Sequence, residues 1–172
     1  MEYTKIIRSR ESIRNYDPGR PVPEEILEKI LNAGRLAPSA RNCQPWKFLL
    51  ISSPVMLEKV SSCYPRDWLK EAPHILVTIG SRSLAWVRSY DGYNTLETDV
   101  AIALTHIILA AENEGVATCW IAAYDPIKLK NVLDLESNME IFGITPLGYP
   151  KPGFSKTLAK KRKSLKEIVE FL

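Results

Sequence analysis

The chain has 172 residues, of which 45% are hydrophobic and 25% are charged, so it can bury one substantial core and reads as a single domain over residues 1–172. This composition excludes disordered and collagen-like classes, which are poor in aliphatic residues or rich in glycine and proline. The formal net charge of +3 is too small to indicate a nucleic-acid partner by itself.

Hydrophobic periodicity and turn signals predict the elements of the first half of the chain. They are a short amphipathic helix (residues 4–8), a helix (23–37), a buried strand (46–51, WKFLLI), a helix (53–62) and a second buried strand (75–79, ILVTI). The second helix is expected to end before Pro38, because the residue that precedes a proline avoids the α conformation.

The second half is predicted to contain a long helix (95–113), a strand (118–122, TCWIA), a helix (125–133) and a strand (141–149), then a polar loop (151–163) and a short apolar tail (165–172). The long helix is apolar around much of its axis, which is typical of burial in a core or against another subunit. Pro146 predicts an edge or a bulge in the last strand. Helices that alternate with apolar strands predict one domain of the α/β type, with its sheet layered between helices.

The three cysteines, Cys43, Cys63 and Cys119, form no CxxC pair and have no histidine at metal-ligand spacing, so no metal site is expected. An odd number of widely spaced cysteines favours a reducing compartment. The charged N-terminus lacks the apolar stretch of a signal peptide, and no apolar run is long enough to span a bilayer. We therefore expect a soluble cytoplasmic protein without a membrane partner.

Two basic segments are candidates for an anion site. Alternate residues of an extended chain share a face, so Arg10, Ser12 and Arg14 would together present two guanidinium forks and a hydroxyl, a donor set suited to phosphate. Lys160 and Arg162 alternate in the same way near the C-terminus. On spacing alone, a solvated basic stretch explains the first segment better, and a solvated tail or a non-specific nucleic-acid contact explains the second.

A third candidate is the loop over residues 37–46, in which two prolines bracket Ser39, Asn42 and Gln44 just before a buried strand. Uncharged donors and acceptors in a rigid loop suit a neutral heterocycle with carbonyl and imide edges better than a metal or a charged substrate. A capping loop that satisfies backbone groups is an equally good interpretation of the same residues.

Motifs for several other chemistries are absent from the sequence. It contains no GxGxxG after a strand, no GxxxxGK[ST] and no GxSxG. His74 and His106 lie in or beside apolar segments and are expected to be structural, and no base accompanies Cys43. Convergent binding motifs without an evident acid, base or nucleophile indicate that a cofactor carries the chemistry.

Five segments resemble, in order and spacing, the signature segments of the FMN-dependent nitroreductase family. They are RSRESIRNY (8–16), APSARNCQPW (37–46), EGVATCWIAAYDP (114–126), PLGYP (146–150) and KKRKSLKEIV (160–169), and the resemblance runs from residue 4 to about residue 170. It implies an α+β fold, a three-layer α-β-α sandwich with a central mixed sheet, and an interlocked homodimer with two FMN molecules at the subunit interface. The long apolar helix would form the dimer core, and the C-terminal tail would wrap onto the other subunit.

The resemblance also implies which residues bind the cofactor. The FMN phosphate would be held by Arg10, Ser12, Arg14, Lys160 and Arg162; the ring and ribityl chain would be covered from the partner subunit by Pro38, Ser39, Ala40, Asn42 and Gln44; and the wall along the ring would be formed by Trp120, Ile121, Ala122 and Ala123. A main-chain amide near Ala122 or Ala123 would point at flavin N5, so no side chain is expected to be catalytic. Many members of the family have two glycines there, whereas alanine requires an ordinary backbone.

The function that the resemblance implies is ping-pong transfer of hydride from NAD(P)H, through flavin N5, to a nitroaromatic, a quinone or a similar small organic acceptor. Two alternatives keep the flavin. One is a different redox reaction, such as reductive dehalogenation or the dehydrogenation of a small metabolite; the other is flavin binding without nicotinamide turnover. The basic tail alone leaves a nucleic-acid-binding protein open, although the resemblance implies no nucleic-acid partner.

Overall fold

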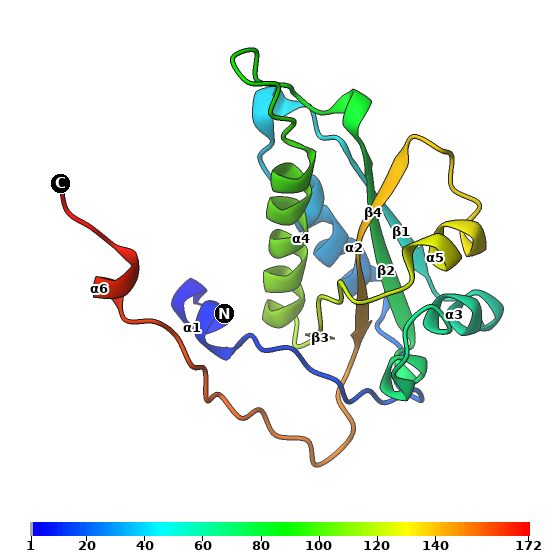
Figure 1. Cartoon of the computed structure of the whole chain (residues 1–172). Helices are drawn as coiled ribbons and strands as arrows, with labels where there is room; N and C mark the ends of the chain where they lie inside the picture. Colours follow the sequence, from blue (N-terminus) through cyan, green and yellow to red (C-terminus); the bar gives the residue numbers. More distant parts are fainter. Residues whose placement is uncertain (1) are drawn as a thin grey trace.

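The computed structural model describes residues 2–172 (Figure 1). Its helices are α1 (Tyr3–Ser9), α2 (Glu24–Arg35), α3 (Pro54–Ser61), α4 (Leu96–Asn113), α5 (Pro126–Val132) and α6 (Leu165–Ile168), and its strands are β1 (Trp46–Ile51), β2 (His74–Ser81), β3 (Ala117–Thr118) and β4 (Met139–Gly148). The first five helices and the first strand confirm the sequence predictions, each to within two residues at either end.

Local sequence explains where two of the shorter helices begin. Pro54 and Pro126 occupy the first position of α3 and α5, where the missing backbone N–H of proline needs no partner. The Asp125 carboxylate caps α5 by accepting a hydrogen bond of 2.9 Å from the backbone N of Lys128. Residue chemistry at these two sites therefore fixes the helix starts that the sequence predicted.

The four strands form one antiparallel sheet in the order β1-β2-β4-β3. A parallel bridge joins Ser12, in the segment after α1, to Thr118 of β3, so parallel pairing enters at this edge. Antiparallel strands with helices packed on both faces place the protein in the α+β class that the resemblance implies. The α/β type, which we expected from the alternation of elements alone, is corrected because alternation does not determine how strands pair.

Helices cover both faces of the sheet (Figure 1). On one face α2 and α4 pack against the strands, and Ile107 of α4 joins the same buried cluster as Leu76 of β2. On the other face lie α3 and α5, where Val60 and Leu129 join the cluster that contains Ile75. Consecutive strand residues point to opposite faces, so Ile75 and Leu76 divide between the two layers of core.

The strand predicted over residues 118–122 is much shorter in the structure. Regular pairing of β3 ends at Thr118, and Ile121 rejoins the sheet only through an isolated bridge to Ile144. Trp120, between these points, is 39% exposed. The sequence of this run therefore has the pattern of a strand, although only Thr118 and Ile121 pair with β4 in the structure.

The bulge expected at Pro146 lies elsewhere. β4 is an interior strand, and the irregularity in its register with β2 falls between Thr78 and Ile79. Pro146 lies between Leu147 and Ile144, where the pairing of β4 with the segment that starts at β3 is interrupted. The missing N–H of proline therefore removes no hydrogen bond between strands there.

Residues 151–172, here called the C-terminal arm, leave the sandwich, extend past α1 and end beyond α6 (Figure 1). Leu165, Ile168 and Phe171 on the arm are exposed. The end of the arm therefore leaves apolar side chains open to solvent. No helix among residues 2–172 combines the length and the apolar character needed to cross a bilayer.

His74, at the start of β2, is buried and joins two loops to the sheet. Its Nε2 accepts a hydrogen bond of 3.1 Å from the backbone N of Val22, so the neutral ring carries its proton on Nδ1, which lies 2.7 Å from the Ser52 hydroxyl oxygen. Burial lowers the pKa of His74 below its ordinary value. The structural role expected from the sequence is therefore supported by hydrogen bonds on both ring nitrogens.

We expect the free energy of unfolding to fall as the pH is lowered from 7 through about 6.5, because the unfolded chain then takes up a proton that folded His74 resists. Chemical denaturation at pH values from about 5 to about 7.5, which lie on both sides of the ordinary histidine pKa, measures this effect. His74→Gln should reduce the pH dependence. An equal pH dependence in wild type and His74→Gln would contradict the assignment.

Candidate functional site

The segment after α1 is fixed at the edge of the sheet by its backbone and by two buried side chains. The N–H of Ile13 donates to the carbonyl of Thr118 at 2.9 Å, and Ile13 and Tyr16 are buried. The Tyr16 hydroxyl donates back to the carbonyl of Ile13 at 2.8 Å, and burial raises the pKa of this phenol well above its ordinary value. With Ile13 and Tyr16 facing inward, the neighbouring polar side chains of the segment face outward.

The C-terminal arm is held against α4 by an ion pair whose carboxylate is buried. Lys156 Nζ lies 2.6 Å from both carboxylate oxygens of Glu112, near the end of α4, and the Ser9 hydroxyl donates to the same carboxylate. Further along, Lys160 Nζ donates to the carbonyl of Ile7 at 3.1 Å. The arm is therefore tied to both α1 and α4 before its chain turns outward.

These contacts create one hollow of about 700 Å³, here called the basic hollow, which is lined from opposite ends of the sequence. Its lining includes Arg10, Ser12 and Arg14 from the first segment and Lys160 and Arg162 from the arm. The two basic segments, each ambiguous on spacing alone, thus face each other in space.

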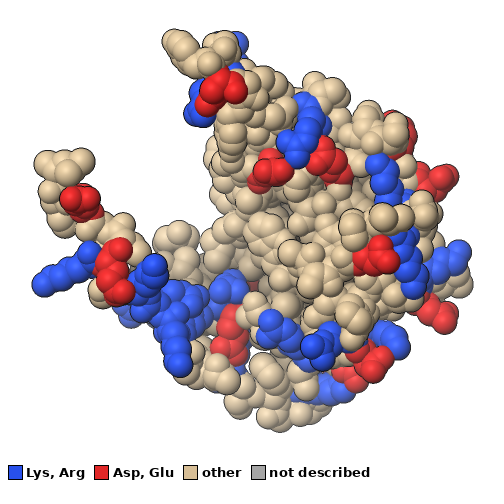
Figure 2. Space-filling view, in the orientation of Figure 1, with Lys and Arg blue, Asp and Glu red and all other residues tan. Residues whose placement is uncertain are grey.

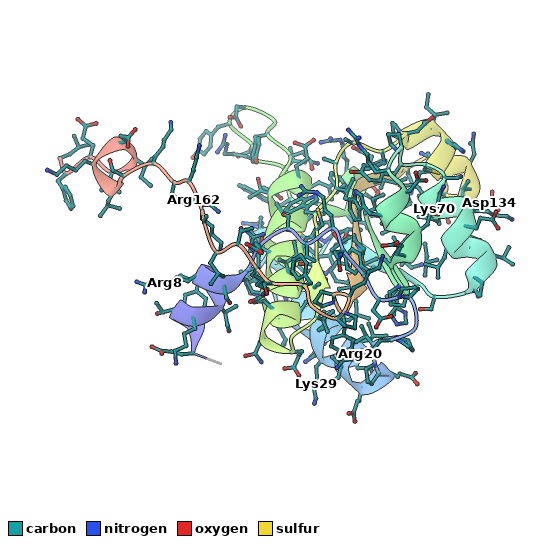
Figure 3. The ribbon with its side chains drawn as sticks, turned by 90° about the horizontal axis from the view of Figure 1, so that it is seen from below. Arg8, Arg20, Lys29, Lys70, Asp134 and Arg162 are labelled. Carbon is teal, nitrogen blue, oxygen red and sulfur yellow. The ribbon has the colours of Figure 1, made fainter. Side chains whose placement is uncertain are left out.

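Positive charge is concentrated around the basic hollow. Partial burial, followed by the neighbouring charges of Arg10 and Arg162, lowers the pKa of Lys160. Figure 2 shows Lys and Arg side chains gathered where the arm leaves the body, and Figure 3 shows Arg8 and Arg162 at this end, remote from Lys70 and Asp134. Cations that repel one another without a ligand are relieved by a bound anion, so the electrostatics favour an anion here.

The donor set matches a phosphate monoester. Arg10 and Arg14 supply planar forks that bind two oxygens at once, Ser12 adds a hydroxyl donor, and Lys160 and Arg162 supply charge from the opposite wall. A flavin mononucleotide would therefore find partners for its phosphate among residues that are present and brought together.

A smaller hollow of about 290 Å³ adjoins the first, because Arg10 lines both. Trp120 also lines it, and so does Ile108, which belongs to α4. The Trp120 indole N–H donates to the carbonyl of Phe142 at 3.4 Å, and the ring occupies space that a side chain at Gly143 would fill, since a Cβ there would lie 2.6 Å from Trp120 Nε1. Gly143 thus allows the indole to stand at the rim of this hollow.

The wall segment that follows Trp120 has an ordinary backbone. Ile121 is buried and exchanges hydrogen bonds of 2.9 and 3.1 Å with Ile144, whereas Ala122 and Ala123 are exposed. Neither alanine has a positive φ, as expected for residues that carry a Cβ. The main chain at Ala122 and Ala123 is accordingly open to a ligand on its outer side.

The loop between α2 and β1 holds the remaining candidates, and a buried carboxylate fixes it. The N–H of Ala40 donates to Asp99 Oδ1 at 3.0 Å, and the Thr95 hydroxyl donates to Asp99 Oδ2 at 2.8 Å. The N–H of Gln44 donates to the Ser39 hydroxyl at 2.9 Å. Three residues of this loop have left-handed backbone: Arg41, Asn42 and Gln44.

The structure does not bring this loop to the basic hollow within one chain. The loop is bound to Asp99, in the first turns of α4, and carries Pro38, Ser39, Ala40, Asn42 and Gln44. The arm is tied to Glu112, in the last turn of α4. More than three turns of α4 separate these points, about 20 Å along its axis. One chain alone therefore places the two sets of candidates at opposite ends of the same helix.

Sequence reasoning missed the acidic residues that build the site. Asp99 and Glu112 read as ordinary charges within a helical pattern, yet both are buried and hold segments that carry candidate residues. Their spacing offers no signal for this role, because Asp99 bonds Ala40 from 59 positions away and Glu112 bonds Lys156 from 44 positions away.

Comparison with known proteins identifies relatives over nearly the whole chain. The profile described as "Nitroreductase family" matches residues 7–62 and 54–149. A protein of Archaeoglobus fulgidus, named for NADH dehydrogenase and NAD(P)H nitroreductase activities, is 35% identical over 155 residues, which is 87% of this chain and 86% of the relative. An iodotyrosine deiodinase of Thermotoga neapolitana is 21% identical over 171 residues, covering 84% of this chain and 87% of that protein.

Solved structures show the same similarity. A nitroreductase family protein of Clostridium difficile 630 superposes with a TM-score of 0.86 at 29% identity, covering 99% of this chain and 98% of the other. An FMN-dependent nitroreductase of Clostridium difficile R20291 has a TM-score of 0.80 at 26% identity, with 96% of each chain covered.

Proposed function

The chain belongs to the nitroreductase family, and from this premise we propose that it is an FMN-dependent oxidoreductase that reduces a small organic acceptor with electrons from NAD(P)H. The observation that carries the proposal is the basic hollow, in which Arg10, Ser12 and Arg14 face Lys160 and Arg162. The FMN-dependent relative supports the choice of cofactor, and the relatives named for NAD(P)H support the electron donor.

In this proposal the protein binds and orients while the cofactor reacts. Arg10, Arg14 and Ser12 hold the phosphate from one wall, and Lys160 and Arg162 hold it from the other. The wall along the ring is formed by Trp120, Ile121, Ala122 and Ala123, with a main-chain amide near the two alanines directed at flavin N5. FMN bound there would supply the two-electron redox chemistry between the nicotinamide and the acceptor.

We further propose that two copies of the chain complete each site. The loop with Pro38, Ser39, Ala40, Asn42 and Gln44 lies about 20 Å along α4 from the basic hollow, so a partner subunit would supply it. The outer side of α4 supports this arrangement, since Ala101, Ile102 and Leu109 line a hollow of about 640 Å³ there. The exposed apolar side chains of the C-terminal arm would also be covered by a partner.

Nitroaromatics and quinones are the acceptor class that we propose first. A second candidate is reductive dehalogenation, which the similarity to an iodotyrosine deiodinase favours. Dehydrogenation of a small metabolite and flavin binding without nicotinamide turnover remain alternatives that an assay separates. We propose a single FMN-binding domain over residues 1–172 and a cytoplasmic location, the latter supported by the three free cysteines.

The proposed activity is tested by anaerobic titration of the FMN-loaded protein with NADH and, separately, with NADPH. We expect the flavin absorption band to bleach with one of them and to return when a nitroaromatic, a quinone or a halogenated phenol is added. Bleaching without return for a given acceptor class would exclude that class. A bound flavin that neither nicotinamide bleaches would contradict the oxidoreductase proposal and leave a flavin carrier.

A further inference from the structure

A carboxylate lies among the cations of the basic hollow. Glu11 stands between Arg10 and Ser12 in the chain and lines the same hollow. By Coulomb's law a carboxylate so placed opposes the binding of a phosphate. None of the ion pairs among residues 2–172 includes Glu11, so no cation contacts its carboxylate directly.

The contacts of Glu11 instead lead to the C-terminal arm. One carboxylate oxygen accepts a hydrogen bond of 3.1 Å from the backbone N of Thr157. The other accepts from the Thr157 hydroxyl at 3.1 Å and from the backbone N of Leu158 at 3.3 Å. All three donors belong to the arm, and Lys160 and Arg162 follow them directly along the chain.

We propose that Glu11 is a positioning residue, which clamps the C-terminal arm so that Lys160 and Arg162 face Arg10, Ser12 and Arg14 across the basic hollow. The inference rests on the proposed function, because the hollow is taken to hold the phosphate of FMN. The buried carboxylate of Glu112 anchors the arm at Lys156. Glu11 contacts the arm at Thr157 and Leu158, closer to Lys160 and Arg162. The segment that contains Glu11 also carries Arg10, Ser12 and Arg14.

The clamp and simple electrostatics predict opposite signs for Glu11→Ala. If the carboxylate acted only through its charge, its removal would tighten FMN binding. If it holds the arm, its removal releases two of the cations, and the dissociation constant for FMN should rise by about tenfold. Riboflavin has no phosphate, so its affinity should change by less than about twofold. A general loss of structure would weaken both flavins alike.

Fluorescence titration with FMN and with riboflavin tests the clamp in wild type, Glu11→Ala, Glu11→Gln and Thr157→Val. Glu28→Ala, an exposed acidic residue of α2, is the matched control and should bind both flavins as wild type does. We expect Glu11→Gln, which keeps one acceptor oxygen, to fall between wild type and Glu11→Ala. Thr157→Val should weaken FMN binding in the wild type but not further in Glu11→Ala, since the two groups share one contact.

Tighter or unchanged FMN binding by Glu11→Ala would overturn the clamp, and so would equal weakening of FMN and riboflavin. Failure of the proposed function has a different signature, because wild type itself would then bind FMN no better than riboflavin. That result would remove the phosphate site and the clamp with it.

Discussion

Replacing Arg10 and Arg14 together with alanine is expected to weaken FMN binding by at least about a hundredfold. Each guanidinium would make charge-assisted hydrogen bonds to the phosphate worth at least about 1.5 kcal/mol, so the loss of two would cost about 3 kcal/mol. The fold should survive, because the intervening buried residue Ile13, together with Tyr16, packs the segment against the sheet. Equilibrium titration with FMN measures the affinity, and circular dichroism checks the fold.

The matched control is Lys29→Ala/Arg35→Ala, which removes the same charge from exposed positions on α2. Lys29 lies away from Arg162 (Figure 3). This control should bind FMN as wild type does. Wild-type affinity in the Arg10/Arg14 double variant would refute the assignment of the phosphate to the basic hollow.

Replacing Lys156 with alanine is expected to lower the free energy of unfolding by about 3 kcal/mol at neutral pH. The side chain of Glu112 is only 7% exposed, so loss of the Lys156 ammonium leaves a buried carboxylate with the Ser9 hydroxyl as its remaining side-chain donor. For a chain of this length the melting temperature should fall by roughly 6–12 °C. Thermal and chemical denaturation measure both quantities.

A second substitution separates the ion pair from the general effect of truncation. Glu112→Gln/Lys156→Met removes both charges and should recover much of the lost stability, because no unpaired charge is then buried. Lys163→Ala, an exposed lysine of the same arm, should change stability by less than about 0.5 kcal/mol. Equal stability of Lys156→Ala and Lys163→Ala would show that the arm is not held at Glu112.

The sequence predicted α1 to α5 well because their signals are local, whereas α6 was expected only as part of an apolar tail. Pro126 and Asp125 mark the start of α5 through chemistry confined to one turn, and the residue before Pro38 lies just beyond the end of α2. Strand pairing is not local. The run over residues 118–122 is apolar after Thr118, but the neighbouring strand β4 pairs only with Thr118 and Ile121, and no sequence pattern marks the gap between them.

Residue spacing alone does not decide the candidate site, because it favours a solvated basic stretch for both basic segments. The alternation of Arg10, Ser12 and Arg14 indicates a shared face, and the structure places all three along one hollow. No local pattern predicts that Lys160 and Arg162 lie close to this segment. Only the resemblance to the nitroreductase family implied that they do. The physical cause of that approach lies in buried or partly buried carboxylates, whose importance depends on partners far away in the chain.

The central claim is that one flavin phosphate is held by both ends of the polypeptide, with the ring covered by a second copy. A crystal structure of the FMN-loaded protein tests it most directly. We expect the phosphate oxygens within about 3 Å of donor atoms on Arg10 and Arg162, and the loop that contains Asn42 to reach the ring from the partner subunit. A phosphate bound elsewhere, with Arg10 and Arg162 directed into separate regions of solvent, would contradict the account.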